Sequence, residues 1–200
     1  MGQTADTVFI EIAVTGPDFT DVDLEEARRH LGSFAPTRAT GAWAPAAEPT
    51  FIEFFIKAVA GGVGTGIGIQ IGKKLWEQAW PLLSAFLEER IERTGRESDI
   101  RRIVIAVDEL EIVLHWPSEQ FLEHNQGEFL YRVHERLTNG RLASLAIQQI
   151  VLPVTIDDDG PRVPRWREYE GEYPTRYWQV RTRNPEPGIG FYDSESDTWI

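Results

Sequence analysis

The chain has 200 residues, 42% of them hydrophobic, with seven Trp and ten Phe, so its composition excludes wholesale disorder and predicts one compact domain with an extension. A formal net charge of −12 argues against nucleic acid as a partner, because the phosphate backbone would be repelled. Cysteine is absent, which excludes disulfides, thiol nucleophiles and Cys-ligated zinc. Because the N-terminus also has no basic region followed by a long apolar stretch, we expect a cytoplasmic protein.

The first ordered elements are a strand and a short helix. Residues 7–15 alternate apolar and other side chains with a period of two, which predicts a half-buried strand. Residues 16–34 begin with turn formers and acidic residues and then carry Leu24, Ala27 and Leu31 at helical spacing, which predicts a helix. Residues 35–49 are rich in Ala, Pro and Gly without periodicity, so we expect an extended connector.

The apolar run at residues 51–60 suits a strand as well as a helix. Two local features favour the helix. Thr50 and Glu53 form a capping-box pattern after Pro49, and Glu53 and Lys57 have the spacing of a helical ion pair. We therefore expect a helix to begin here and to continue into the glycine-rich run that follows.

That run, residues 61–74 (GGVGTGIGIQIGKK), fits neither phosphate-binding pattern. A dinucleotide fingerprint needs a third glycine where isoleucine stands, and a P-loop needs glycine at Ile67 and a hydroxyl at Lys74. Small residues instead recur every fourth position, which is the pattern of a glycine zipper whose bare faces allow another backbone to approach. The predicted helix-packing positions are Ala60, Gly62, Gly64, Gly66, Gly68 and Gly72.

Each interior glycine costs about 1 kcal/mol of helix propensity relative to alanine, so this face needs a packing partner. The partner is the protein's own sheet, a second copy in an oligomer, or lipid. Residues 58–72 form an uncharged run of fifteen, which is shorter than the ~20 residues needed to span a bilayer. This length favours a helix buried within the protein. A membrane-perturbing effector that uses the helix 51–93 is the alternative.

The helix is expected to continue to Gly95, with a kink or break near Pro81. Its apolar seam consists of Trp76, Trp80, Leu83, Leu87 and Ile91. Residues 100–116 then predict a hairpin that turns at Asp108 and Glu109. Residues 127–140 predict a helix, and residues 146–156 predict a further strand.

The last forty-four residues change in character and predict a small β extension, residues 157–200, after a core domain of residues 1–156. Its aromatic side chains exceed what a small sheet can bury, so we expect part of them to pack on the main domain or to contact a partner. The arginines of residues 165–183 make that stretch locally basic within an acidic chain. This combination suits self-association or an acidic protein partner. The predicted partner-binding residues are Trp166, Tyr169, Tyr173, Tyr177, Trp178, Trp199, Arg165 and Arg167.

No catalytic constellation stands out, so we expect a noncatalytic protein without a cofactor or a metal. The four histidines, at positions 30, 115, 124 and 134, lack the HExxH spacing, and the serines lack a nucleophile-elbow motif. The acidic clusters at residues 157–160 and 193–197 are typical of hairpin turns and lack the EF-hand pattern. A metal-dependent hydrolase that uses His124, His134 and nearby Glu stays as a second alternative.

The order of elements resembles a known family. A strand like TVFIEIAVT, an acidic helix, a Pro-containing connector, a small-residue helix ending in Leu-Trp and a hairpin like IRRIVIAVDELEIVLHW are similar to the effector-associated constant components of actinobacterial conflict systems, over residues 7–116. The resemblance implies a small noncatalytic component that acts through protein contacts beside variable effectors in bacterial defence modules.

Together these patterns predict an α+β protein. We expect a mixed or antiparallel sheet, a long Gly-rich helix packed on it, and a small C-terminal β extension. The expected function is that of an adaptor or sensor component in a bacterial defence or signalling module, with a protein partner or a second copy of the chain as its ligand.

Overall fold

The computed structural model describes residues 6–15, 20–32, 38–41, 51–60, 65–95, 98–165, 169, 171–183 and 188–200. The elements in chain order are β1 (Asp6–Thr15), α1 (Asp21–Leu31), β2 (Arg38–Gly41), β3 (Phe51–Ala60), α2 (Thr65–Thr94), β4 (Asp99–Val107), β5 (Leu110–His115), η1 (Phe121–Asn125), α3 (Gln126–Thr138), η2 (Arg141–Ser144), β6 (Ile147–Leu152), β7 (Thr155–Asp157), β8 (Gly160–Arg162), β9 (Tyr177–Thr182), β10 (Gly188–Asp193) and β11 (Thr198–Trp199).

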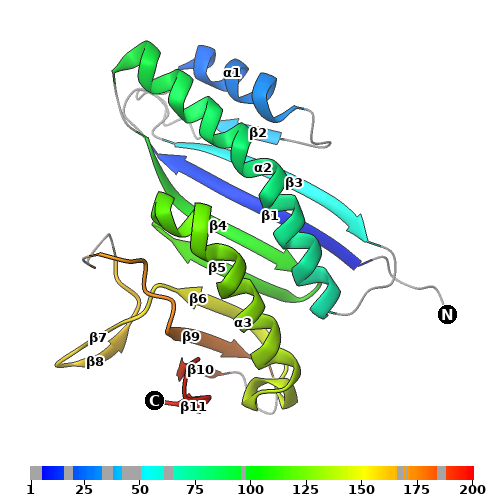
Figure 1. Cartoon of the computed structure of the whole chain (residues 1–200), viewed down its shortest axis with the longest axis vertical. Helices are drawn as coiled ribbons and strands as arrows, with labels where there is room; N and C mark the ends of the chain where they lie inside the picture. The colour runs from blue at the N-terminus through cyan, green and yellow to red at the C-terminus, as the bar shows by residue number, and fades with distance from the viewer. Residues whose placement is uncertain are drawn as a thin grey trace.

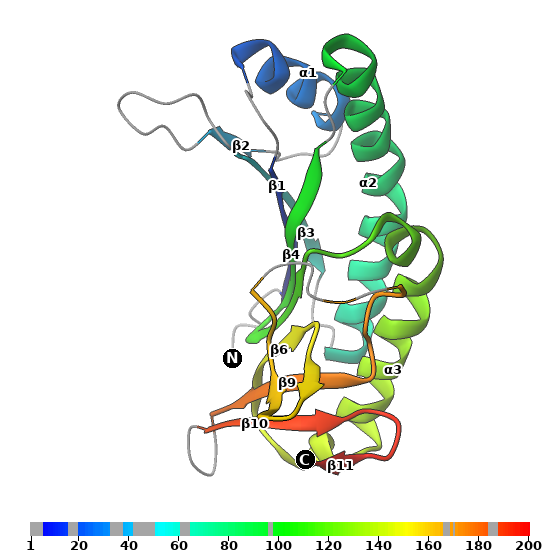
Figure 2. The same ribbon diagram turned by 90° about the vertical axis from the view of Figure 1, so that its left-hand side faces the viewer.

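One nine-stranded sheet forms the centre of this fold, with the strand order β11-β10-β9-β6-β5-β4-β1-β3-β2 (Figure 1). Figure 2 shows α1, α2 and α3 on the same face of the sheet, so the described elements form two layers. Neighbouring strands are antiparallel except β5 and β6, which run parallel because α3 crosses between them. The predicted α+β class with a mixed sheet is confirmed.

Strand β1 lies between β3 and β4 and shows why the alternating pattern was informative. Val8, Ile10, Ile12 and Val14 are all 0% exposed and belong to the core under the helices. Because successive side chains of a strand point to opposite faces, the intervening residues lie on the other face of the sheet. The predicted hairpin is also present, since β4 and β5 pair across a two-residue turn in which Asp108 has a φ of 54°.

The prediction of a helix at residues 51–60 is wrong, because this segment is strand β3. All ten of its residues pair with β1, from Phe51 opposite Thr15 to Ala60 opposite Asp6, and β2 pairs along its other side. Backbone hydrogen bonds to two neighbouring strands outweigh the local capping pattern, and the aromatic and β-branched residues of the segment suit a strand. Ala60 therefore ends a strand and does not share a helix face with Gly68 and Gly72.

Helix α2 begins at Thr65 and lies across β1, β3 and β4. Gly72 is buried against this sheet, and a Cβ atom there would lie 3.1 Å from Cγ2 of Ile105 and 3.8 Å from Cγ1 of Val8. The close approach of helix and sheet thus leaves little space for a side chain at Gly72. Gly66 and Gly68 belong to the same helix, whereas the predicted packing positions Gly62 and Gly64 lie outside the described residues.

The predicted seam of α2 divides into two parts. Trp76 and Leu83 are buried in the core, Trp80 and Leu87 are partly buried, and Ile91 is 40% exposed. The break expected at Pro81 does not form, since α2 is continuous to Thr94. A proline removes one backbone hydrogen bond, and burial of the neighbouring turns of the helix against the sheet outweighs that loss.

A buried ion network joins α1 to the end of α2. Asp23 is 1% exposed and Arg90 is 0% exposed, and Nε of Arg90 lies 3.3 Å from Oδ1 of Asp23. Arg93 donates to Asp23 and also to Oε2 of Glu26, at 2.9 Å for the latter bond. Burial favours a raised pKa for Asp23, but hydrogen bonds from Thr20 and Arg93 outweigh it and hold the pKa below its ordinary value.

The C-terminal strands β9, β10 and β11 continue the main sheet beyond β6. Trp178, Val180 and Tyr192 are 0% exposed and belong to the same core as β1. The predicted domain boundary at residue 157 therefore does not coincide with a break in the sheet. Strand β9 pairs with β6, and its buried side chains belong to the same hydrophobic core. Only the short hairpin of β7 and β8 forms a separate two-stranded sheet within the described residues.

Candidate functional site

A cleft of about 600 Å³ opens between the C-terminal half of α2 and the connection from β5 to η1. Its apolar lining consists of Trp80, Leu87, Ile91, Ile100, Pro117 and Leu122. Three of these residues, Trp80, Leu87 and Ile91, are the part of the α2 seam that the sheet does not bury. The cleft therefore explains why the helix carries more apolar surface than its contact with the sheet requires.

The aromatic wall of the cleft is held in place by the core. The ring of Trp80 stacks on that of Trp76 with centroids 5.5 Å apart. Trp76 in turn donates from Nε1 to the carbonyl oxygen of Leu122 at 3.3 Å, which ties α2 to η1. Both walls are thus fixed before any ligand arrives, which reduces the entropy lost on binding.

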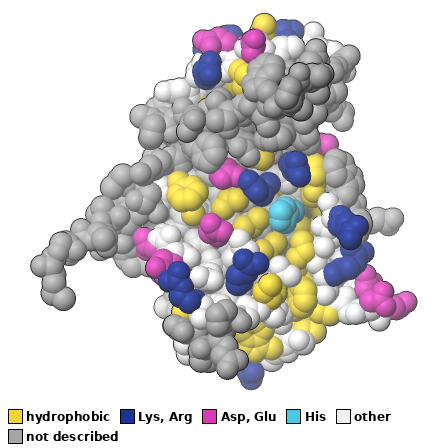
Figure 3. All heavy atoms as spheres, turned by 180° about the vertical axis from the view of Figure 1, so that it is seen from behind, with side chains coloured by type: hydrophobic (Ala, Val, Ile, Leu, Met, Phe, Trp, Pro, Cys, Tyr) yellow, Lys and Arg dark blue, Asp and Glu magenta, His cyan; other side chains and the backbone are white. Residues whose placement is uncertain are grey.

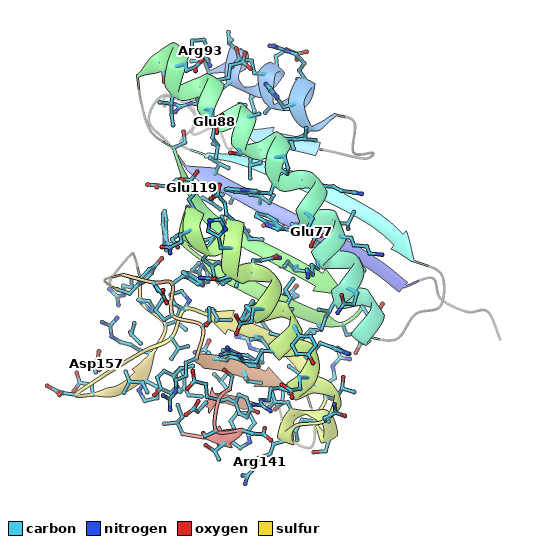
Figure 4. All side chains as sticks on the ribbon, viewed as in Figure 1. Glu77, Glu88, Arg93, Glu119, Arg141 and Asp157 are labelled. Carbon is cyan, nitrogen blue, oxygen red and sulfur yellow. The ribbon has the colours of Figure 1, made fainter. Side chains whose placement is uncertain are left out.

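Carboxylates surround this apolar surface. Glu88 comes from α2, Asp99 from the start of β4 and Glu119 from the segment before η1. Glu88 and Glu119 are exposed, and Figure 4 shows both on the helix-covered side of the molecule. Among the described residues that line the cleft there is no Lys, Arg or His. The cleft is thus chemically suited to an apolar group that carries a positive charge.

The hydroxyl groups of the cleft take part in local hydrogen bonds. Ser84 donates to Oε1 of Glu88 at 3.3 Å, and Ser98 accepts from Nη1 of Arg90 at 2.6 Å. Ser118 accepts from the backbone N–H of Phe121 at 3.3 Å. These bonds shape the polar part of the wall, and none of them forms the serine–histidine pair of a nucleophilic site.

Of the predicted partner-binding residues, Tyr169 lines the cleft and donates from its hydroxyl to the carbonyl oxygen of Trp116. Tyr173 and Trp178, which were also predicted to bind a partner, are buried core residues, 5% and 0% exposed. Tyr173 packs on Phe121 with centroids 4.5 Å apart and donates to the carbonyl oxygen of His115 at 3.1 Å. Their aromatic area is used by the protein's own fold.

The remaining predicted partner-binding residues do not form one surface. Trp199 is 40% exposed but packs on Tyr192, and Tyr177 lies under the guanidinium of Arg176 at 4.9 Å. Arg165 is exposed and lies on the opposite face of the sheet from the helices. Trp166 and Arg167 lie outside the described residues.

Two arginines of the C-terminal segment form ion pairs with acidic side chains of the protein itself. Nη2 of Arg176 lies 2.8 Å from Asp193, and Nη1 of Arg183 lies 2.7 Å from Glu109. The hydrogen bond from Arg176 holds the pKa of Asp193 well below its ordinary value, although burial of the carboxyl acts in the opposite direction. Two of the arginines thus bind acidic groups of the protein itself.

The histidines lie apart from the cleft and from one another. Nε2 of His30 lies 2.6 Å from Glu89, Nε2 of His124 lies 3.6 Å from Glu123, and Nδ1 of His134 lies 3.3 Å from the hydroxyl of Thr138. Over the part of the chain that the structure describes, no group of three His, Asp or Glu side chains is arranged to hold a metal ion. Within the same residues, none of the helices combines the length and the apolar character that a membrane crossing requires.

Sequence reasoning missed the cleft because its walls lie far apart in the chain, at residues 80–91 and 117–122. The one sequence feature that could have indicated the cleft is the apolar seam of α2, which includes more residues than the sheet buries. Comparison with known proteins adds no further constraint on the site, since no protein-family model, no curated protein and no solved structure matches this chain.

Proposed function

We propose that the protein is a noncatalytic adaptor or sensor component that works by binding another protein. In this proposal the cleft beside α2 receives a segment of the partner that carries an apolar side chain next to Lys or Arg. The observation that carries the proposal is the composition of the cleft, in which Glu88 and Glu119 lie beside an apolar floor and no described Lys, Arg or His is among the lining residues.

The two parts of the cleft have different roles in such binding. Burying one Leu-sized side chain of the partner on Trp80, Leu87 and Ile91 contributes about 1.5–3 kcal/mol. The carboxylates discriminate against acidic segments and orient basic ones, because like charges brought together in a cleft are repelled. The net charge of −12 increases the rate of encounter with a basic partner at low ionic strength.

This binding mode revises the chemistry of the partner expected from the C-terminal arginines, since Arg176 and Arg183 are paired internally. The resemblance over residues 7–116 suggests where the partner is encoded. Constant components of conflict systems accompany variable effectors, so the first candidates are the products of the genes that flank this one. We place the protein in a bacterial defence or signalling module on this basis.

The test is co-expression with each flanking gene product, followed by affinity measurement on any complex that forms. Reversing two cleft charges in the variant Glu88→Lys/Glu119→Lys should weaken a cleft-bound complex at least tenfold. The matched control is Glu25→Lys/Glu128→Lys, which makes the same change in net charge at two side chains that are each 75% exposed. Equal binding by both double variants would show that the partner does not use the cleft.

A further inference from the structure

A second cavity lies on the face of the sheet opposite the helices. It has a volume of about 470 Å³ and lies over the ends of β1, β4 and β5, beneath the segment that follows β8. Figure 3 shows this face, where Lys and Arg side chains lie near a His side chain, with Asp and Glu side chains also close by. The titratable side chains that line the cavity are Arg101, Arg102, His115 and Arg165.

The cavity carries an excess of positive charge. Arg102 is paired with Glu11, which lies on the neighbouring strand β1. Arg101 and Arg165 are exposed and have no acidic partner among the described residues. Within the described part of the chain, two guanidinium charges thus lack an acidic partner at one place in a protein whose net charge is −12. A cationic cavity in an acidic protein is not explained by overall composition.

His115 adds a polar group that remains neutral at neutral pH. It lies opposite Arg102 in the pairing of β4 with β5 and is partly buried. Burial lowers the pKa of His115, and the charges of Arg102 and Arg101 lower it further. The neutral imidazole adds no further charge to the cavity and offers a hydrogen bond to a ligand.

Trp116 forms an apolar wall of the cavity and has an unusual backbone. Its φ of 52° lies in the left-handed region, which a large side chain rarely adopts. Two hydrogen bonds hold this conformation, one from its N–H to the carbonyl oxygen of Arg101 at 2.9 Å and one accepted from the hydroxyl of Tyr169. Strain of this kind persists where the surroundings enforce it, and it is common at ligand sites.

We propose that this cavity binds a small organic molecule through a phosphate monoester group. The guanidinium groups of Arg101 and Arg165, which have no acidic partner among the described residues, match the double negative charge of such a group, and guanidinium geometry allows paired hydrogen bonds to phosphate oxygens. The volume is in the range of about 300–1,000 Å³ typical of small-molecule sites, so it exceeds what a phosphate alone fills. Trp116, Val163 and Pro164 supply apolar surface for the organic part.

This site is independent of the proposed cleft, because it lies on the other face of the sheet and uses different residues. A protein that fails to bind phosphate esters could still bind a partner protein through the cleft, and the reverse also holds. The two proposals therefore fail separately.

The experiment is titration of the purified protein, by calorimetry and by tryptophan fluorescence, with AMP, ribose 5-phosphate, inorganic phosphate and uncharged adenosine. We expect at least one of the two esters to bind more tightly than about 1 mM and at least tenfold more tightly than inorganic phosphate or adenosine. A preference for AMP identifies a nucleotide site, and equal affinity of the two esters identifies a sugar-phosphate site. No saturable binding of either ester would overturn the proposal, as would equal binding of inorganic phosphate.

Variants locate the binding. Arg101→Gln and Arg165→Gln should each weaken binding of the ester at least tenfold, since hydrogen bonds to charged groups are worth more than neutral ones. Both side chains are exposed, so these changes leave folding intact. The matched control is Arg28→Gln, an exposed arginine of α1 that should leave the affinity unchanged. Binding that is the same in all three variants would show that the ester occupies another place.

Discussion

Replacing Gly72 with leucine tests the packing of α2 on the sheet. Even a Cβ atom at this position would lie 3.1 Å from Cγ2 of Ile105, which is fully buried, so the rest of a leucine side chain has no space. Overpacking of this kind costs about 1–3 kcal/mol, and moving the helix outward also exposes Val8 and Ile105, at about 1.5–3 kcal/mol for each side chain fully exposed. The gain in helix propensity returns only about 1 kcal/mol. We therefore expect a net loss of about 2–4 kcal/mol for Gly72→Leu.

Gly72→Ala separates the two effects, because it gains the same propensity and adds only the Cβ atom. Its stability should lie within about 1 kcal/mol of the parent protein. The assay is urea denaturation followed by tryptophan fluorescence, with linear extrapolation to water. Gln78→Leu is the matched control, since it adds a leucine at an exposed position of the same helix and should change stability by less than about 0.5 kcal/mol. A Gly72→Leu protein as stable as the control would refute the close approach of helix and sheet.

Three further predictions concern buried polar groups. Asp23→Asn should cost about 3–5 kcal/mol, because it removes a charged carboxylate from the buried pair with Arg90, whereas Glu25→Gln on the exposed side of α1 should be nearly neutral in the same urea assay. The pKa of His115 in the folded state lies below its ordinary value of 6.5, so the unfolded state takes up the proton first as the pH falls. The free energy of unfolding should therefore decline below pH 6.5 in the urea assay, and His115→Gln should reduce that decline. Tyr173→Phe should cost about 0.5–1.5 kcal/mol through the hydrogen bond to the backbone of His115, and a neutral result in urea would contradict that contribution.

The ion network of α1 and α2 shows a limit of reading patterns along the chain. Asp23 looks like a helix-start residue, and it does take part in the capping box of α1 with Thr20. Its buried contacts with Arg90 and Arg93 come from residues about seventy positions away. The charge of a residue gives no indication of such pairing, because an Asp is the same residue in the sequence whether its side chain is exposed or buried in the fold. The same limit applies to the aromatic residues Tyr173 and Trp178, which were expected on a surface and lie in the core.

Several elements could be predicted from the sequence because their pattern is local: β1, the β4–β5 hairpin, α1 and α3. Side-chain periodicity and turn residues specify these over a few positions. That residues 51–60 form a strand could be seen only in the folded structure. Their hydrogen-bond partners are β1 and β2, and the sequence of the segment itself does not reveal them. The tertiary structure also created the cleft and the cationic cavity, whose walls come from segments far apart in the chain. The cleft depends on the packing of α2 beside the segment before η1, and the cavity depends on the pairing of β1, β4 and β5 and on the segment that follows β8.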